Sequence, residues 1–154
     1  MNNFAAKAVL AATVTLAVAA SPAMAGIRYN SQADPLTAWQ DDVAQAQMYG
    51  QFYVENASYL RNNTNQRDPR PGGDAVYEET TYFYYQNCGG VQQWCSHGVD
   101  TGPETSSSDW YFQYDHDQLD SLADRGRMST HVCEDHGFWG ADPCSINALG
   151  TFSY

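Results

Sequence analysis

Four histidines are the residues of this chain best suited to chemistry, because all of them lie near carboxylates between His97 and His136. The stretch "YDHDQLD" places one histidine among three aspartates, and "HVCEDH" encloses a glutamate and an aspartate between two histidines. Imidazole and carboxylate side chains together can ligate a transition metal or act as general acid and base. The candidate metal ligands are His97, Asp115, His116, Asp117, His131 and His136.

The spacing of these residues does not match a known metal motif. His131 and His136 are five residues apart, whereas the H-E-x-x-H helix places its two histidines four apart on one face. An EF-hand loop that began at Asp115 would need Gly at its sixth position, where Asp120 stands. We therefore expect no cofactor, and we keep a calcium or zinc site as an alternative.

Other catalytic patterns are weaker still in the sequence. The chain has no G-x-S-x-G motif, and its serine cluster, Thr105 to Ser108, lies in a segment with loop composition. Two acids such as Glu78 and Asp109 can be proposed for glycoside cleavage, but eighteen carboxylates offer many such pairs. We expect a non-enzymatic protein, and an extracellular hydrolase or metal-dependent enzyme built on the His/Asp cluster is the alternative.

The cysteines indicate disulfide bonds rather than a metal site. Cys88, Cys95, Cys133 and Cys144 are even in number, and neither neighbouring pair has the C-x2-C spacing of zinc ligands. Three pairings are possible. We favour Cys88–Cys95 and Cys133–Cys144, because each pair encloses a loop that contains Gly or Pro.

The first 25 residues have the composition of a secretory signal peptide. Lys7 provides a positive start, an apolar run covers Ala8 to Ala20, and small residues flank a cleavage point after Ala25. The apolar run is shorter than the ~20 residues that span a bilayer. We expect a secreted protein in which residues 26–154 form a single β-rich domain, without membrane insertion after cleavage.

The charge of residues 26–154, the part expected to be exported, argues against some classes of binding partner. Cleavage of the leader would remove Lys7, the only lysine, and leave six arginines against eighteen carboxylates. The difference is a formal charge of −12, which repels nucleic acid and anionic lipid. The expected partner is a protein or a glycan of the cell envelope, and not a nucleic acid.

Aromatic side chains are the main binding feature of the sequence. The chain has 21 Phe, Trp and Tyr residues in all, so some of the rings can lie at the surface. A tyrosine ring can pack against apolar groups while its hydroxyl contacts water or a partner. The rings proposed to stack on a sugar or to fill a partner's pocket are Tyr84, Trp94, Trp110, Tyr111 and Trp139.

The elements that must carry these residues are mainly strands. Alternating or aromatic-rich patterns predict strands, and polar segments rich in Gly, Pro and Asn predict loops. One short N-terminal helix is predicted from Asp34 to Met48. Asp34 can cap it, Pro35 suits its first position, and apolar residues follow at helical spacing. The predicted strands are 48–60, 75–86, 108–115, 127–133 and 148–154, the predicted loops are 61–74 and 97–108, and a helical turn is predicted within 117–126.

Several aromatic strands with little helix predict a mainly β protein, either an antiparallel β-sandwich or a small barrel. The four consecutive aromatics from Tyr82 to Tyr85 fit a central strand that is covered on both faces, or a strand with one face in the core and the other forming an exposed aromatic surface. As an uncovered edge, the same run would pair with other copies, so a self-assembling surface protein is a further alternative.

Three segments carry a resemblance to known proteins: "GQFY" from Gly50, "RDPRPGGDAVYEETTYFYY" from Arg67 and "THVCEDHGFWGADPCS" from Thr130. Over Gly50 to Tyr154 the chain resembles uncharacterised small secreted proteins of actinobacteria. Their motifs have no assigned chemistry, so the resemblance implies no function.

Overall fold

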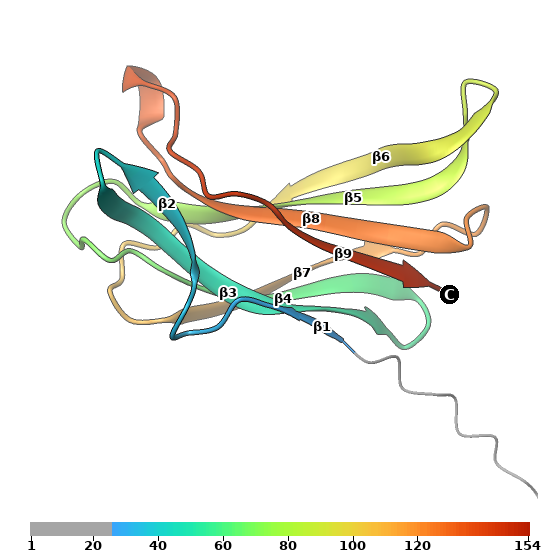
Figure 1. Ribbon diagram of the computed structural model, residues 1–154, viewed down its shortest axis with the longest axis horizontal. Helices are drawn as coiled ribbons and strands as arrows, with labels where there is room; N and C mark the ends of the chain where they lie inside the picture. Colours follow the sequence, from blue (N-terminus) through green and yellow to red (C-terminus); the bar gives the residue numbers. More distant parts are fainter. Residues whose placement is uncertain (1–25) are drawn as a thin grey trace, which may run out of the picture.

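Two antiparallel sheets pack face to face in the structure, a computed structural model that describes residues 26–154 (Figure 1). The first sheet has the order β1–β3–β4–β7, with β2 also paired to β3: β1 (Ile27–Tyr29), β2 (Leu36–Gln40), β3 (Val43–Glu55), β4 (Tyr59–Arg67) and β7 (Tyr111–Gln118). The second sheet has the order β6–β5–β8–β9: β5 (Val76–Cys88), β6 (Val91–Thr101), β8 (Arg125–Glu134) and β9 (Ala148–Ser153). The signal peptide predicted over residues 1–25 lies outside the described residues.

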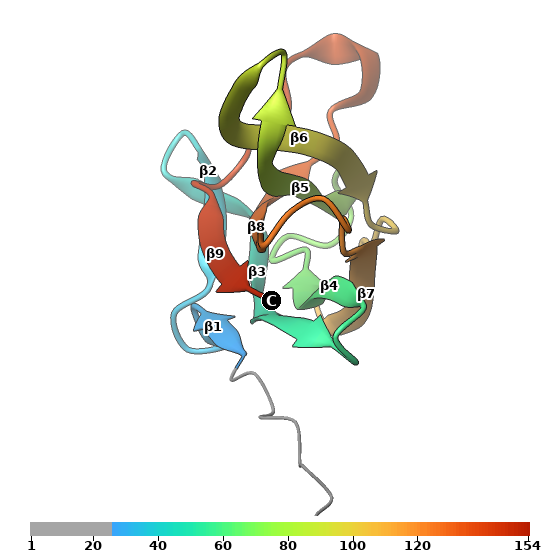
Figure 2. The same ribbon diagram turned by 90° about the vertical axis from the view of Figure 1, so that its right-hand side faces the viewer.

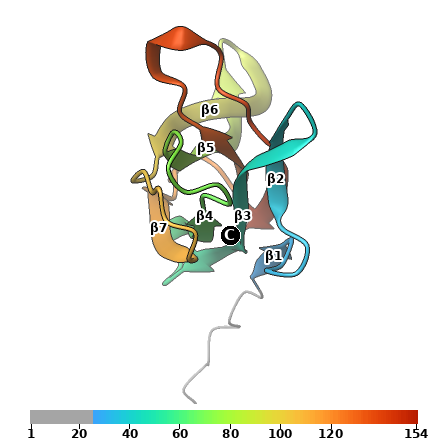
Figure 3. The same cartoon turned by 90° about the vertical axis from the view of Figure 1, so that its left-hand side faces the viewer.

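Figures 2 and 3 view the strands end-on from opposite sides: Figure 2 shows β5 and β8 above β3 and β4, and Figure 3 shows β5 above β3 and β4. The predicted mainly β, sandwich-type fold is therefore confirmed. The described residues contain one short helical element, the 3-10 turn η1 (Gly137–Trp139). Within residues 26–154, no helix has the length and apolar character needed to cross a membrane.

The segment from Asp34 to Met48 forms a β-hairpin, so the predicted N-terminal helix is wrong. Asp41 and Asp42 join β2 to β3, and their φ angles of 50° and 61° are those of a type I′ turn. The apolar spacing was compatible with a helix only if Trp39 faced the core. Trp39 is instead exposed, because Leu36 and Ala38 point into the core and strand alternation turns Trp39 outward.

Two polar segments that predict loops are partly strands. Most of β4 comes from 61–74, and the end of β6 comes from 97–108. The reason is that Asn62, Thr64 and Gln66 point into the core, where hydrogen bonds within the protein replace those to water. The predicted strand 48–60 is divided by a turn at Asn56 and Ala57, both with φ of 51°.

The connection between β7 and β8 also differs from the expectation, because residues 119–124 form turns and not a helical turn. The other predicted strands are present with shifted ends: 75–86 lies in β5, 127–133 in β8, most of 148–154 in β9, and 108–115 overlaps β7.

The core lies between the inner faces of the two sheets. In β5, Tyr82 and Tyr84 are buried in the core, whereas Phe83 and Tyr85 lie on the outer face, as strand alternation requires. Gly126 in β8 has no side chain, and this allows Leu60 of the opposite sheet to pack against its backbone. The buried apolar residues are Tyr29, Leu36, Ala38, Ala46, Met48, Phe52, Leu60, Val76, Tyr82, Tyr84, Met128, Val132, Ala148 and Phe152.

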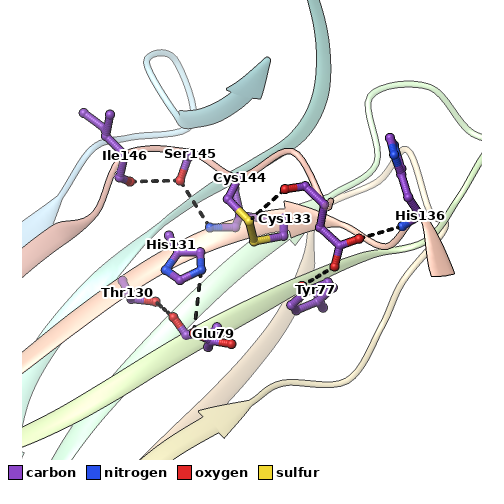
Figure 4. The surroundings of a disulfide bond; sticks show 11 residues. Tyr77, Glu79, Thr130, His131, Cys133, His136, Cys144, Ser145 and Ile146 are labelled. Atoms are coloured by element: carbon purple, nitrogen blue, oxygen red, sulfur yellow. Dashed lines mark hydrogen bonds and ion pairs between the residues drawn. A yellow bond between two sulfur atoms is a disulfide. The ribbon is translucent and has the colours of Figure 1, made fainter. Parts of the chain in front are cut away.

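Both disulfides have the pairing that the sequence favours, Cys88–Cys95 and Cys133–Cys144. The first lies in the β5–β6 hairpin, beyond Tyr84, the last residue of β5 that pairs with β8. The second joins the end of β8 to the segment that precedes β9 (Figure 4). One disulfide therefore holds a two-stranded ribbon, and the other holds a connection at the edge of the core.

We expect the Cys133→Ser/Cys144→Ser double variant to lose about 2–3 kcal/mol of unfolding free energy, the chain-entropy value for a loop of this length. The Cys88→Ser/Cys95→Ser variant should lose less, because the ribbon beyond Tyr84 has no backbone pairing with β8 and can fray in the folded state. Urea unfolding of both variants measures the difference. Equal losses, or an unchanged midpoint for the first variant, would contradict this assignment.

Candidate functional site

The interior of the sandwich contains a hydrogen-bonded polar cluster around Glu78 of β5. Glu78 is fully buried, and its carboxyl group accepts hydrogen bonds from Asn62 Nδ2 at 3.0 Å and Gln113 Nε2 at 2.9 Å. The hydroxyls of Thr80 and Thr130 also donate to it. These donors come from β4, β7, β5 and β8, so the cluster connects the two sheets.

Glu78 also has a second carboxyl group beside it, that of Asp115. Burial, and then the hydrogen bond and charge of Asp115, raise the pKa of Glu78 to about 9. Glu78 is therefore protonated at neutral pH and can donate a hydrogen bond to Asp115. Asp115 Oδ2 is buried and has no other hydrogen-bond partner. The pair resembles a catalytic acid and base in composition, but no substrate can reach a carboxyl group with no exposed surface.

Glu78 and Asp109, the two acids considered for glycoside cleavage, lie in different environments. Glu78 is in the core, whereas Asp109 is exposed in the segment that precedes β7. Glycosidases need two carboxyl groups about 5–10 Å apart across an open cleft. One enclosed and one surface carboxyl group do not form such a pair.

The predicted metal ligands are distributed over several parts of the sandwich. His97 of β6 contacts Asp117 of β7, with 2.7 Å between Nδ1 and Oδ2, where the edges of the two sheets approach each other. His116 lies on the outer face of the first sheet, beside the Tyr59 ring. His131 is 3.8 Å from Glu79 on the outer face of the second sheet.

The separation of these residues follows from strand geometry. Asp115 and Asp117 pair with inward-facing residues of β4, so the residue between them, His116, must point outward. His136 lies apart from them, after β8, with its Nε2 at 2.9 Å from Glu134 Oε2. That carboxyl group raises the pKa of His136. The six predicted ligands therefore do not meet at one point in the described part of the chain.

The five predicted binding rings also differ in position. Tyr84 is fully buried, and its hydroxyl donates to Gln118 O at 2.7 Å, so it presents no ring at the surface. Trp94 is half-buried on the outer face of the second sheet, with the Arg127 guanidinium 4.1 Å from its ring centre. Tyr111 is exposed at the start of β7. The side chain of Trp139 lies outside the described part of the structure.

Trp110 is the predicted ring with the most extensive surroundings, because it belongs to the outer face of the first sheet. We call this surface the aromatic face. It is made of the outward-pointing side chains of β1, β3, β4 and β7, together with Trp110 just before β7. Its rings are Tyr49, Tyr53, Tyr59, Trp110, Phe112 and Tyr114, and its polar side chains are Arg28, Gln47, Gln51, Glu55, Arg61, Asn63, Asn65, Arg67 and His116.

A cleft of about 330 Å³ opens on the aromatic face where β1, β3 and β4 meet. The rings of Tyr49 and Phe112 form part of its wall, and Phe112 is 54% exposed. The amides of Gln51, Asn63 and Asn65 and the guanidinium of Arg28 also line it. An amide offers a donor and an acceptor on one planar group, so the cleft can form several hydrogen bonds beside a ring surface.

Two arginines hold the neighbouring rings in place. Arg67 donates from Nε to Gln47 Oε1 at 2.9 Å, and its guanidinium lies 4.5 Å from the centre of the Trp110 ring. Trp110 in turn contacts Tyr49 edge to face, with ring centres 4.8 Å apart. Arg61 lies 3.9 Å from the centre of the Tyr114 ring. Such cation–π contacts restrict the rings before any ligand binds.

The charge of this surface differs from that of the rest of the chain. Arg28, Arg61 and Arg67 point outward from β1 and β4, and Glu55 is the one carboxylate that points outward from the described strands of this face. Glu55 is paired with Arg61 at 2.6 Å. Three arginines and one carboxylate give the aromatic face a formal charge of +2.

The amide side chains of the cleft were not predicted as site residues. Asn63 and Asn65 lie in the segment 61–74, whose Asn, Asp, Pro and Gly content favours a loop. The sequence holds no signal that would have found them, because all seven residues from Arg61 to Arg67 are polar and nothing in their order separates inward from outward side chains.

No known protein family, curated protein or solved structure matches the chain. The function is therefore argued from the geometry of the aromatic face and its cleft.

We expect the Glu78→Gln variant to gain stability relative to the wild-type protein as the pH rises from about 4.5 to about 9. The raised pKa of Glu78 means that its protonated form contributes stability that is complete below the ordinary value of 4.5 and is lost as the pH approaches about 9. A glutamine keeps the shape and the donor at every pH.

Urea unfolding between pH 5 and pH 9 measures this difference in unfolding free energy. Glu104→Gln, the same change at an exposed loop position, is the control and should follow the wild-type pH dependence. A difference between Glu78→Gln and the wild type that stays constant with pH would refute the protonated state of Glu78.

Proposed function

We propose that the protein is a secreted, non-enzymatic, disulfide-stabilised domain that binds a carbohydrate chain through the cleft of its aromatic face. The observation that carries this proposal is the composition of the cleft, in which Tyr49 and Phe112 stand beside the amides of Gln51, Asn63 and Asn65. Ligand sites combine apolar walls with a few polar groups that fix orientation, and this cleft has both.

The chemistry of a sugar matches this composition. A pyranose ring exposes C–H bonds on its faces and hydroxyls around its edge, so it can stack on an aromatic ring while it forms hydrogen bonds sideways. Phe112 offers such a ring surface, because more than half of it is exposed. The three amides can donate to and accept from adjacent hydroxyls, and Arg28 can pair with an acidic substituent of a sugar.

The positions of the rings support binding at low entropic cost. Trp110 is held by its contacts with Arg67 and with Tyr49. Side chains that are ordered before binding lose little freedom on binding, and this raises the affinity of a site of a given area. The scaffold is also stiff below the cleft, since Asn62 and Thr64 of the same strand form hydrogen bonds in the core.

Export is the second part of the proposal. The composition of residues 1–25 is that of a signal peptide, and two disulfides form stably only in an oxidising compartment. A glycan of the cell envelope or of the surroundings is available to a protein in that location. The formal charge of −12 on residues 26–154 argues against nucleic acid as the ligand.

We expect Phe112→Ala and Asn63→Ala each to weaken glycan binding by about tenfold or more, which corresponds to about 1.4 kcal/mol. The first change removes the exposed ring of the cleft, and the second removes an amide from its wall. An array of bacterial envelope, plant and animal glycans identifies the ligand. Titration followed by tryptophan fluorescence then gives the dissociation constants, because Trp110 contacts the cleft residue Tyr49.

Phe138→Ala is the matched control, since Phe138 is a fully exposed phenylalanine on η1, away from the aromatic face. It should bind the glycan with wild-type affinity, and thermal melting should show that all three variants are folded. A failure of the wild-type protein to bind any glycan, or equal loss of binding in Phe138→Ala, would refute the proposal.

A further inference from the structure

A second group of chemically competent side chains lies at the end of the sandwich where β8 ends and β5 begins. Asp74 precedes β5, Glu134 is the last residue of β8, and His136 follows two residues later. One ligand atom from each of the three lies within 4.8 Å of the other two. The sequence indicated His136 as a candidate ligand and placed Glu134 in the same His/carboxylate stretch, but it did not indicate Asp74.

The backbone around this group is fixed by contacts that do not involve the three side chains. Glu134 pairs with Val76 in the sheet, and its N–H donates to Pro143 O at 3.1 Å. The N–H of Asp135 donates to Ala75 O at 2.8 Å, which holds the residue after Asp74 beside the end of β8.

The Cys133–Cys144 disulfide closes the loop that carries His136 (Figure 4). Asp142 anchors that loop through two hydrogen bonds. Its Oδ1 accepts one from the His136 N–H at 2.9 Å, and its Oδ2 accepts the other from the Tyr77 hydroxyl at 2.7 Å. The position of His136 is therefore set by the disulfide and by the Tyr77–Asp142 contact, before any ligand arrives.

The separation of the ligand atoms suits a small divalent cation. Glu134 Oε2 and His136 Nε2 are 2.9 Å apart, in direct hydrogen-bond contact. Two adjacent ligands on Zn²⁺ at about 2.0–2.2 Å each are roughly 3.0–3.5 Å apart, so a small outward movement of one side chain admits the ion between them. The Glu134 side chain is only 8% exposed, so it supplies a well-ordered ligand, whereas Asp74 is exposed and can close over an ion from the solvent side.

We propose that Asp74, Glu134 and His136 form a binding site for a divalent transition-metal ion such as Zn²⁺. One imidazole and two carboxylates favour Zn²⁺ and its neighbours in the first transition series over Ca²⁺, which takes six to eight oxygen ligands. Water completes the coordination on the exposed side. The ion joins the segment before β5 to the loop after β8, and it stabilises this end of the sandwich independently of the aromatic face.

His131, Cys133 and Cys144 also lie close together, but they do not form a competing site. The two sulfur atoms are bonded to each other, and only a free thiolate ligates zinc. The test must therefore keep both disulfides intact, because reduction would create new thiol ligands.

The test is calorimetric titration of the full chain with ZnCl₂, in buffer without reductant or chelator. We expect one saturable site per chain and a higher melting temperature with Zn²⁺, reversed by EDTA, because an ion that binds only the folded state stabilises it. Asp74→Asn should weaken Zn²⁺ binding at least tenfold, and His136→Gln should abolish it. Asp74 lies in an exposed segment, so its variant tests the site without a change in the core.

The matched controls are Asp109→Asn, an exposed aspartate, and His97→Gln, a histidine that is also paired with a carboxylate. Both should bind Zn²⁺ as the wild-type protein does. The proposal is overturned if Zn²⁺, Mn²⁺ and Ni²⁺ all give no saturable binding. It is also overturned if Asp74→Asn and His136→Gln bind as tightly as the wild type, or if a control loses binding to the same extent.

Discussion

Hydrogen bonds between buried side chains of the two sheets are the interaction that fixes the alignment of this sandwich. Asn62 of the first sheet donates to Glu78, Thr80 and Thr130 of the second, so hydrogen bonds cross the core and fix one sheet against the other. A buried polar group left without its partner costs on the order of 1–3 kcal/mol. A shift of one sheet by a single residue would break several of these bonds at once, so the network specifies one alignment.

The alignment inside the core also determines the surface outside it. Because side chains alternate along β4, hydrogen bonds that hold Asn62 and Thr64 inward direct Asn63 and Asn65 outward, into the cleft. The same rule on β7 places Gln113 against Glu78 and leaves Phe112 and Tyr114 on the aromatic face. The internal network and the external cleft are therefore two consequences of one register.

The sequence was informative where local patterns decide the structure. Alternation located β5, β8 and β9, and the Gly- or Pro-containing loop within each cysteine pair favoured the correct pairing. It failed where contacts distant in sequence decide: Asn62, Thr64 and Gln66 form a strand only because their partners lie on β1, β5, β8 and the Pro103 segment. The cleft could not be predicted for the same reason, since its walls come from four separate segments.

The uneven distribution of charge has a consequence for encounters in solution. Of the formal charge of −12 on residues 26–154, the aromatic face carries +2, which leaves −14 for the remainder. The molecule therefore has an electric dipole whose positive end is the aromatic face. Near a negatively charged surface this dipole turns the aromatic face forward, while the net charge of −12 opposes the approach of the molecule as a whole, and added salt weakens both effects.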